Sequence, residues 1–342
     1  MMVDARADHA TPAAGLRVSV IVPTHARAAL VMRLLESLAG QTLAPAAYEV
    51  IVVHNFTDDG TESLVRDWCA QQPFVARYFR KDYKGPARSR DFGARTANAA
   101  VVAFIDDDCV AGPQWLAEGL AAFDHGGQPH VASTASGQPA LVQGRTLALA
   151  QRPARFPYRT IQIEQSSIFF ETCNIFYDRA VFLHIGGFSP DFLDAYFGED
   201  TDLGWKLVSA GHPAVFAPAA VVRHEVHEVS LAHWMFEPAR FGRLPDLVRR
   251  YPALRRHMMW RYFFSRETLL FNGFVLALLV CLLSPAIGGV LLLAYCIARY
   301  RTGAHVGSPA LRVARVVMGV PRGAVAWWSM LRGSLHSRTL LL

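Results

Sequence analysis

The stretch V-V-A-F-I-D-D-D, residues 101–108, joins an apolar run to three consecutive aspartates. The apolar run predicts a buried strand, whereas three adjacent carboxylates repel one another and favour solvent. Carboxylates at the tip of a buried strand therefore need a compensating cation, and the usual one is a hard divalent metal with oxygen ligands. A strand that ends in solvated aspartates is the alternative, and the triplet alone leaves both interpretations open.

Segments around this stretch alternate between strand-like and helix-like patterns. Apolar runs predict strands at 18–22, 49–53, 77–79 and 101–105, and helical segments separate them at 29–38, 61–70 and 87–99. This order predicts a parallel sheet covered on both faces, with ligands beyond the carboxyl ends of the strands. Three of these ends are polar and fall on one rim, namely Pro23-Thr24-His25, His54-Asn55 and Asp106–Asp108. No G-x-G-x-x-G follows the first strand, which excludes a dinucleotide-binding fold.

The second half of the chain is less periodic. Turns rich in Gly and Pro predict irregular strands within 126–170, residues 198–210 predict a loop entering a helix, and residues 214–224 predict a strand, a turn and a second strand. The five cysteines are scattered without C-x-x-C spacing, so neither a disulfide framework nor a zinc ribbon is expected. Residues 1–16 lack an apolar core and are expected to be a disordered leader.

Charge is distributed unevenly along the chain. Residues 240–342 contain 15 arginines, no lysine and only two acidic residues, Asp246 and Glu267, whereas acidic residues outnumber basic ones before residue 240. Because these arginines flank the uncharged stretch 269–298, anionic membrane lipids are favoured over nucleic acid as the partner. Residues 238–266 predict a basic amphipathic segment on the bilayer surface, and the segment after 316 predicts a second interfacial one.

The uncharged stretch is interrupted by Ser284-Pro285 and Gly288-Gly289. As one straight helix it would be about 45 Å long, against a hydrocarbon core of about 30 Å. The interruption and the flanking arginines favour a hairpin whose two ends lie on the cytoplasmic side. Each arm is short for a full span, so a re-entrant pair and a buried core helix stay open as alternatives.

Several further motifs occur in order along the first two thirds of the chain. They are V-S-V-I-V-P-T-H-A-R at 18–27, E-V-I-V-V at 49–53 with D-D-G-T at 58–61, G-P-A-R-S-R-D-F-G at 85–93, F-I-D-D-D at 104–108, G-G-F at 186–188, G-E-D-T-D-L-G-W-K-L at 198–207 and V-V-R-H at 221–224. Each is weak alone, but the ordered set resembles family 2 glycosyltransferases of the GT-A fold over residues 17 to about 230. The C-terminal sequence is similar to that of membrane-anchored bacterial members.

The resemblance implies an α/β GT-A fold with a mixed, mostly parallel sheet and C-terminal membrane-associated helices. The expected parts are a leader (1–16), a catalytic domain (17–237), a basic interfacial segment (238–268), a transmembrane or re-entrant hairpin (269–298) and a basic amphipathic C-terminal segment (299–342). The implied location is the inner, cytoplasmic membrane, with the catalytic domain facing the cytoplasm.

The implied activity is an inverting transfer of one sugar from a nucleotide-diphosphate donor to a lipid-linked or envelope glycan. Mg²⁺ or Mn²⁺ would neutralise the departing diphosphate, with Asp106, Asp108 and His224 as ligands. Asp200 is the expected base for the acceptor hydroxyl, and Glu199 would orient the acceptor or a metal-bound water. The alternatives are a surface role for His224 and a helix-capping role for the Glu199-Asp200 pair. No Q-x-x-R-W segment follows this pair, so a single addition is expected rather than processive synthesis.

Further residues are implied in donor and acceptor binding. The nucleotide-sugar site is expected to include Pro23, Thr24, Arg27, Asn55, Arg90 and Asp107. Trp205 would stack on an acceptor sugar, with packing into the core as the alternative. The segment H-N-F-T at 54–57 departs from the D-D-G-S of the family, although the Asn55 amide still offers a donor and an acceptor to a base edge. UDP-, GDP- and dTDP-sugars therefore stay open as donors.

Two other classes of function share some of these sequence features. A nucleotidyltransferase would carry a Gly-rich G-x-G-T-R loop after the first strand, where this chain has P-T-H-A-R. An inert membrane scaffold that kept the fold is favoured only by His54-Asn55, and the acidic residues and His224 oppose it.

Overall fold

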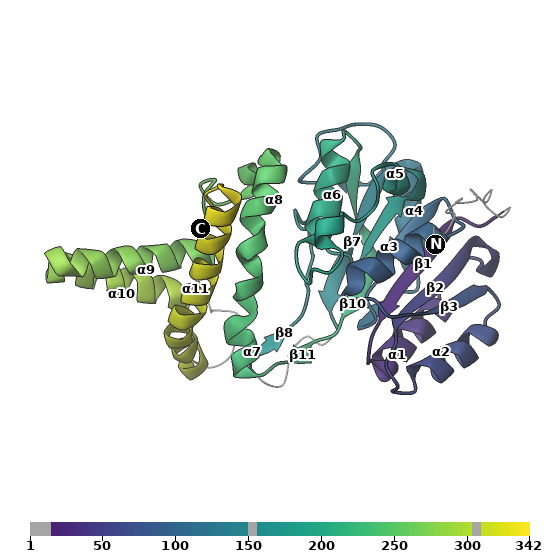
Figure 1. Cartoon of the computed structure of the whole chain (residues 1–342), viewed down its shortest axis with the longest axis horizontal. Coiled ribbons are helices and arrows are strands. Elements are labelled where there is room, and N and C mark those ends of the chain that lie inside the picture. The colour runs from purple at the N-terminus through teal and green to yellow at the C-terminus, as the bar shows by residue number, and fades with distance from the viewer. Residues whose placement is uncertain (1–14, 150–155, 303–308) are drawn as a thin grey trace, which may run out of the picture. The chain divides into compact units, whose positions relative to one another are not determined.

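The computed structural model describes residues 15–149, 156–302 and 309–342, which belong to two compact units. Of the described residues, the first unit comprises 15–149 and Thr160–His227, and the second comprises 156–159, 228–302 and 309–342. Figure 1 shows the helices and strands of each unit. The first unit is a mixed α/β structure built on one large sheet, and the second is mainly helical.

The sheet of the first unit has nine strands in the order β3-β2-β1-β4-β9-β7-β10-β5, with β6 paired to β10. Their bounds are β1 Val18–Thr24, β2 Tyr48–Asn55, β3 Val75–Lys81, β4 Val101–Phe104, β5 Cys109–Ala111, β6 Gln128–Pro129, β7 Leu141–Ala148, β9 Ile175–Asp178 and β10 Ala214–His224, while β8 (Tyr158–Arg159) and β11 (His227–Glu228) lie outside this sheet. Strands β1 to β4 pair in parallel, as the largely apolar sequences of β1, β2 and β4 predict. Strand β9 runs antiparallel between β4 and β7, so the sheet is mixed.

Helices cover both faces of this sheet. They are α1 Ala28–Ala39, α2 Thr61–Ala70, α3 Pro86–Thr96, α4 Trp115–His125, α5 Arg179–His184 and α6 Glu199–Ser209, with short 3₁₀ turns at Pro45–Ala47 and Pro190–Phe192. Alternate residues of β1 point to opposite faces: Val20 and Val22 join the core beneath α1, whereas Ile21 faces α3. At Gly93 of α3 a Cβ would lie 2.4 Å from the Ile21 side chain, so glycine permits this close packing.

The strand register brings the polar strand ends to one rim. Thr24 at the end of β1 lies beside His54 of β2, and Phe104 at the end of β4 lies beside Ile21. At the other side of the sheet, His224 at the end of β10 pairs with Cys109 at the start of β5. His224 is thereby placed next to the aspartate triplet that precedes Cys109.

One sequence-based expectation about local structure is wrong. Residues 214–224 form one strand, β10, with a register irregularity between Ala217 and Val221, rather than two strands and a turn. The basic segment expected at 238–266 contains several short helical segments. Three of these segments have a proline in their first turn, where proline fits a helix, whereas it disrupts a helix interior.

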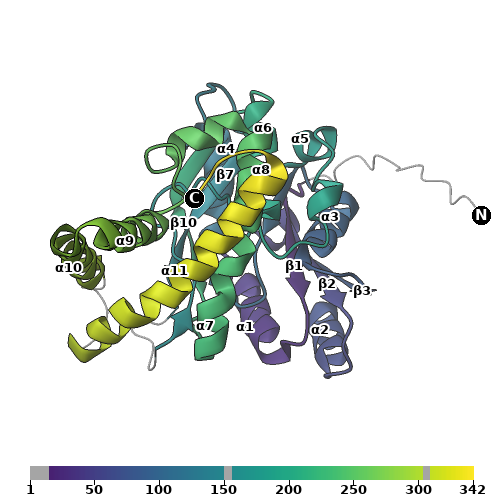
Figure 2. The same ribbon diagram turned by 60° about the vertical axis from the view of Figure 1, so that its left-hand side comes forward.

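The second unit is built around three long helices. Its elements are α7 Leu231–Phe236, η3 Glu237–Arg243, α8 Leu244–Arg250, η4 Pro252–His257, α9 Arg266–Leu283, α10 Pro285–Thr302 and α11 Pro309–Ser337. Helix α9 ends at Ser284, where the chain turns into α10, and these two helices pack side by side (Figure 2). Helix α11 packs against α9, α10, α8 and η3.

Helix α9 is the one helix of the described ranges that is long and apolar enough to cross a membrane, and 17% of it is buried. Large apolar side chains are exposed on both α9 and α10. They are Leu276, Leu278, Leu279, Leu282 and Leu283 on α9, and Ile287, Val290, Leu291, Leu293 and Ile297 on α10. The second unit therefore has exposed apolar side chains on two helices that pack against each other.

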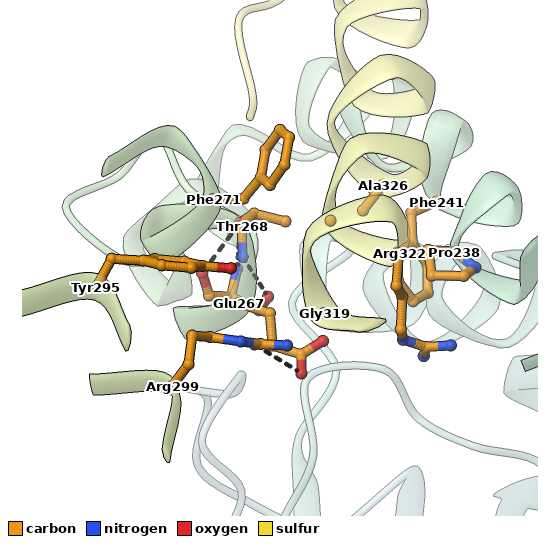
Figure 3. A pocket seen from close by; sticks show the side chains of 12 residues that line it. Pro238, Phe241, Glu267, Thr268, Phe271, Tyr295, Arg299, Gly319, Arg322 and Ala326 are labelled. Atoms are coloured by element: carbon orange, nitrogen blue, oxygen red, sulfur yellow. Dashed lines mark hydrogen bonds and ion pairs between the residues drawn. The ribbon is translucent and has the colours of Figure 1, made fainter. Parts of the chain in front are cut away.

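A pocket within the second unit lies among α9, α10, α11 and η3 (Figure 3). Phe271 and Tyr295 form part of its apolar lining. Its arginines are already paired with acids: Arg299 lies 3.3 Å from Glu267, and Arg322 forms an ion pair of the same length with a glutamate of η3. The paired charges offer no basis for assigning an anionic ligand to this pocket.

Candidate active site

The three aspartates after β4 have different partners. Asp106 forms an ion pair with Arg90 of α3. Asp107 accepts a hydrogen bond of 2.8 Å from the Thr24 hydroxyl, and Asp108 accepts one of 2.8 Å from Nε2 of His227. The triplet is therefore partly buried and paired, and does not simply end the strand in solvated carboxylates.

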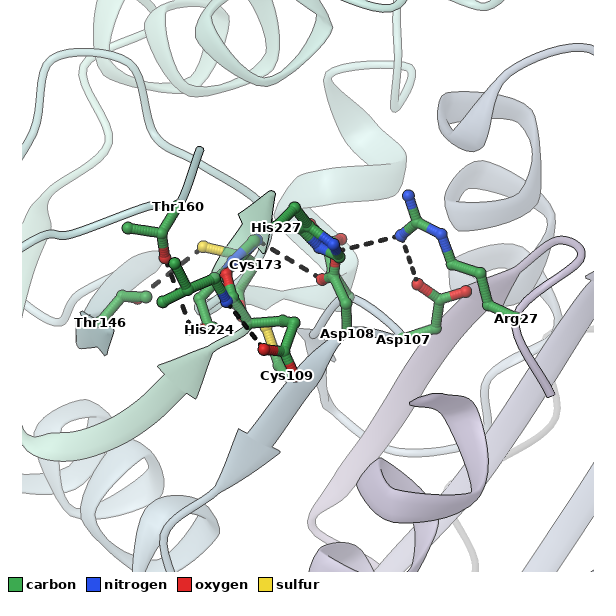
Figure 4. Close-up of polar contacts among 12 residues, drawn as sticks. Arg27, Asp107, Asp108, Cys109, Thr146, Thr160, Cys173, His224 and His227 are labelled. Carbon is green, nitrogen blue, oxygen red and sulfur yellow. Dashed lines mark hydrogen bonds and ion pairs between the residues drawn. The ribbon is translucent and has the colours of Figure 1, made fainter. Parts of the chain in front are cut away.

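Arg27 bridges two of these carboxylates (Figure 4). One of its guanidinium nitrogens donates to Oδ1 of Asp107 and to Oδ2 of Asp108, both at 3.0 Å. Burial raises the pKa of Asp107 to about 6, although Arg27 opposes the rise. The Arg27 side chain is 41% exposed, so its positive charge is also accessible to an anionic ligand above the rim.

Asp108 has one carboxylate oxygen that accepts no hydrogen bond from any described residue. This buried atom, Oδ1, lies 3.4 Å from Nε2 of His224. The other ring nitrogen of His224, Nδ1, lies 2.9 Å from the Glu225 carbonyl oxygen and donates to it, because a carbonyl can only accept. In the neutral imidazole Nε2 then presents a lone pair towards the free oxygen of Asp108.

The free oxygen of Asp108 and Nε2 of His224 face each other in a buried site, so together they are suited to bind a cation. Burial raises the pKa of Asp108, but the hydrogen bond from His227 and the positive charge of Arg27 oppose this effect, and the pKa is lowered to about 2, so the carboxylate is ionised. The carboxylate oxygen suits Mg²⁺ or Mn²⁺, whereas the imidazole nitrogen also suits softer transition-metal ions such as Zn²⁺.

Cys109 is the third potential metal ligand near this pair, since its sulfur, an Asp108 oxygen and a His224 nitrogen lie within 4.8 Å of one another. Burial raises the pKa of the Cys109 thiol well above its usual value. It is therefore expected to remain protonated and to contribute little to binding a hard metal.

Arg90 lies beside a second group of acidic residues. Its side chain is 5% exposed and pairs with Asp106, while NH1 lies 3.8 Å from Glu199 and 3.9 Å from Asp200. These two carboxylates stand in the first turn of α6, whose N-terminal dipole favours negative charge. The buried guanidinium of Arg90 therefore forms ion pairs both with the end of β4 and with the start of α6.

Both acids of α6 have raised pKa values. Burial is the main cause for each, and repulsion from Asp200 adds to the effect on Glu199, whose pKa rises to about 8. Asp200 is the better candidate for the ionised partner, because both of its oxygens accept hydrogen bonds from Thr172 at 3.0 Å. One carboxyl that holds a proton beside one that is ionised is an arrangement suited to acid–base chemistry.

The remaining donor-site candidates lie along the same rim. Thr24 and Pro23 end β1, and Asn55 ends β2. Oδ1 of Asn55 accepts from the Ser89 hydroxyl at 3.2 Å and from the Tyr83 amide at 3.3 Å. Its amide N–H groups are therefore the part of the side chain that can face a donor base.

Trp205 does not have the position expected of an acceptor platform. The indole is 1% exposed, its nitrogen donates to the Ile168 carbonyl at 2.9 Å, and its ring lies edge-on to Phe170. The structure thus favours the alternative of core packing for Trp205.

The sequence reasoning missed two residues that touch the predicted site, His227 and Thr172. The sequence carried one signal for His227, since it follows His224 by three residues in H-E-V-H. Nothing in the local sequence distinguishes Thr172 from other threonines. Asp106 and Asp108 also have different partners, which the sequence did not predict: Asp106 contacts Arg90, whereas Asp108 contacts the two histidines.

Comparison with known proteins agrees with this geometry. Residues 19–186 match the family model described as Glycosyl transferase family 2. This segment is a family 2 glycosyltransferase domain. The matched segment contains the aspartate triplet, Arg90 and Thr172 but ends before α6 and β10, so these elements extend the family 2 domain seen in the structure.

Named relatives are also glycosyltransferases. Validoxylamine A glucosyltransferase of Streptomyces hygroscopicus subsp. limoneus is 30% identical over 71% of this chain, and the Pre-mycofactocin glycosyltransferase of Mycobacterium tuberculosis is 29% identical over 71%. The matches span 58% and 50% of the lengths of those two proteins.

Solved structures share the fold. The mannosyltransferase PcManGT of Pyrobaculum calidifontis aligns with a TM-score of 0.56 at 17% identity, over 96% of this chain and 89% of its own. The TarS fragment 1–349 of S. aureus aligns with a TM-score of 0.54 at 18% identity, over 95% of this chain and 93% of its own. The family 2 domain therefore has the GT-A fold that the ordered motifs predicted.

Proposed function

We propose that this protein is an inverting, metal-dependent glycosyltransferase that moves a single sugar from a nucleotide-diphosphate donor to a lipid-linked or envelope glycan. The proposal is carried by one observation, that two groups of side chains lie on the same rim of the sheet in a family 2 domain. One group is Asp108 with His224, which offer free ligand atoms, and the other is Asp200 with Glu199 beside Arg90. The relatives named as glycosyltransferases support the reaction class.

In the proposed reaction the acceptor hydroxyl oxygen attacks the anomeric carbon from the face opposite the leaving group. The bond between that carbon and the diphosphate oxygen breaks, and the nucleoside diphosphate leaves. Asp200 accepts the hydroxyl proton, which its raised pKa favours. Glu199, with a pKa of about 8, keeps a proton at neutral pH and can hydrogen-bond the acceptor.

Asp108 and His224 are the residues proposed to hold the divalent ion, and Asp106 stays a predicted third ligand. When bound, the ion supplies positive charge for the departing diphosphate. Arg27 adds a partly exposed positive charge at the same rim. The mannosyltransferase from Pyrobaculum calidifontis, solved with GDP-Man and Mn²⁺, supports a manganese-assisted reaction in this fold.

Asp108→Asn tests the metal assignment. We expect Mn²⁺-stimulated release of nucleoside diphosphate from the donor to fall by about two orders of magnitude, because one charged ligand is lost. Chelation of the wild type with EDTA should give the same loss, reversed by added Mn²⁺. Asp124→Asn is the matched control, since Asp124 is 43% exposed and pairs with Arg17 away from the rim. Equal Mn²⁺ stimulation in the wild type and Asp108→Asn would overturn the assignment.

The donor base is proposed to be read by Asn55 through its amide N–H groups, which suit a base carbonyl such as O4 of uracil or O6 of guanine. The neighbouring folds were solved with GDP-Man and with UDP-GlcNAc, so both bases remain candidates. Titration of the full chain with UDP, GDP and dTDP in the presence of Mn²⁺ decides among them.

The helical unit is proposed to attach the enzyme to the cytoplasmic face of the inner membrane. The support is the exposed apolar surface of α9 and α10, with arginines at the end of α10. Each of these helices has 18 residues and is about 27 Å long at 1.5 Å per residue. This length nearly matches the hydrocarbon core, and the arginines suit anionic lipid headgroups.

Leu279→Glu and Leu282→Glu, made together, test the attachment. Both side chains are exposed on α9, and a charge within the hydrocarbon core costs about 2.5 to 3.5 kcal/mol per residue. We expect the fraction of protein that floats with vesicles containing anionic lipid to fall at least about tenfold. The control is Leu64→Glu, an exposed leucine on α2, which should leave flotation unchanged. Full flotation of the double variant would contradict the attachment.

A further inference from the structure

The carboxylate of Asp200 is held by two donors from one residue. The backbone N–H of Thr172 donates to Oδ2 and its hydroxyl donates to Oδ1, both at 3.0 Å. Two bonds to the two oxygens fix the plane of the carboxylate as well as its position. The Asp200 side chain keeps 23% of its surface exposed, so its remaining lone pairs can still face an acceptor.

Thr172 is itself held rigidly. It is 1% exposed and lies just before β9, between a buried phenylalanine and Asn174. The Asn174 side chain donates to the carbonyls of Arg145 and Ala220, at 2.9 Å each, and accepts from the Trp115 indole at 2.8 Å. The chain two residues beyond Thr172 is therefore fixed to strands β7 and β10 and to helix α4.

Helix α6 is attached to the segment 168–172 at two more points. The Thr201 hydroxyl donates to the Phe169 carbonyl at 3.1 Å, and the Trp205 indole donates to the Ile168 carbonyl at 2.9 Å. Trp205, which does not face an acceptor, thus serves to fix α6 against this segment. Of these three attachments, the one from Thr172 is made to the carboxylate that is proposed as the base.

Several ionisable groups act on Asp200. Asp106 from the end of β4 repels its negative charge, and Glu199 from α6 and Glu171 beside Thr172 do so when they are ionised; buried Tyr177 and Cys173 lie close enough to interact with it. Arg90 from α3 and the two Thr172 donors favour the ionised form. Without the Thr172 hydroxyl, the Asp200 carboxylate would lose one of the hydrogen bonds that favour its ionised form, while the neighbouring acidic residues would still disfavour that form.

We propose that Thr172 is a positioning residue of the transfer reaction, which orients the Asp200 carboxylate and keeps it ionised by donating from both its amide and its hydroxyl. This inference rests on the proposed function, because it assigns Thr172 a role only through Asp200 as the base. Threonine is suited to this position because its β-branched side chain has few rotamers, so the hydroxyl points in a fixed direction.

Thr172→Val removes the hydroxyl and keeps the shape of the side chain. We expect kcat to fall about tenfold or more, the donor KM to stay within about twofold, and the acid limb of the kcat–pH profile to move up by about one pH unit, since one hydrogen bond to the carboxylate is lost. Thr172→Ser, which keeps the hydroxyl, should restore the acid limb. Thr201→Val removes a neighbouring hydroxyl bond that does not reach Asp200, and it should leave the acid limb in place.

A second readout separates this inference from the proposed function. The Asp200 carboxyl is titrated by ¹³C NMR in the full chain, with its signal assigned by its absence in Asp200→Asn. A higher pKa in Thr172→Val than in the wild type and Thr172→Ser supports the inference, whether or not any donor is turned over. An unchanged carboxyl pKa, or a Thr172→Ser variant as shifted as Thr172→Val, overturns it. Absence of turnover in the wild type with every nucleotide sugar would instead refute the proposed function.

Discussion

Replacing Asp200 by asparagine is expected to lower kcat by about 10²- to 10⁴-fold, the range that general-base catalysis contributes. The asparagine amide has nearly the same shape but cannot accept the acceptor proton. Donor binding should change little, because Asp200 lies on the α6 side of the rim, next to Arg90 and Thr172. Single-turnover transfer and a donor binding titration, measured on the same preparation, separate the two effects.

The control for this substitution is Asp194→Asn. Asp194 is 50% exposed and pairs with Arg88, so its carboxylate has no route to the acceptor. Its variant should retain wild-type kcat. If Asp200→Asn kept its turnover, Asp200 would not be the base, and Glu199 would be the next carboxyl to replace.

Replacing Arg90 by methionine is expected to lower the free energy of unfolding by about 3 to 5 kcal/mol at pH 8, as for other buried ion pairs that lose one partner. Methionine keeps much of the side-chain volume but leaves three neighbouring carboxylates, Asp106, Glu199 and Asp200, without their shared cation. Urea denaturation of the full chain in detergent, without added metal, measures the change.

This loss of stability should depend on pH in a defined direction. The pKa of Glu199 is about 8 in the folded protein against an ordinary value of 4.5, and Arg90 opposes that rise. Protonation of Glu199 and of Asp200 therefore stabilises the folded protein. This contribution to the free energy of unfolding is fully present below the pKa that each group has in the unfolded chain, and it is lost as the pH rises through the folded pKa. The variant should therefore recover part of its stability at pH 5, where the crowded carboxyls take up protons. A deficit equal at pH 5 and pH 8 would contradict the electrostatic explanation.

Arg88→Met provides the matched control for Arg90→Met. Arg88 lies on the same helix, α3, and also pairs with an aspartate, but its side chain is 40% exposed. Exposed ion pairs contribute about 0 to 1 kcal/mol. A large loss in both variants would indicate that the helix, rather than the buried charge, is sensitive to substitution.

Local sequence patterns were sufficient for the parallel half of the sheet. The apolar runs at 18–22, 49–53 and 101–105 predicted strands, because a strand covered on both faces must be largely apolar, and the structure has strands at Val18–Thr24, Tyr48–Asn55 and Val101–Phe104. Parallel pairing then placed their polar ends on one rim. The ordered motifs added the family and the fold. The same patterns failed at 214–224, where a proline suggested a turn but the strand continues through an irregularity.

The amino-acid sequence alone determined the alternating strands and helices, the acidic rim and the apolar helices of the second unit, because each depends on side chains close together along the chain. Tertiary structure alone decided how the site residues are paired. Arg27 reaches Asp107 across 80 positions, and His227 reaches Asp108 across 119. Contacts over such separations depend on strand register and helix packing, which a one-dimensional pattern does not contain. For the same reason only the folded chain separated Asp106 from Asp108 and brought Thr172 to Asp200.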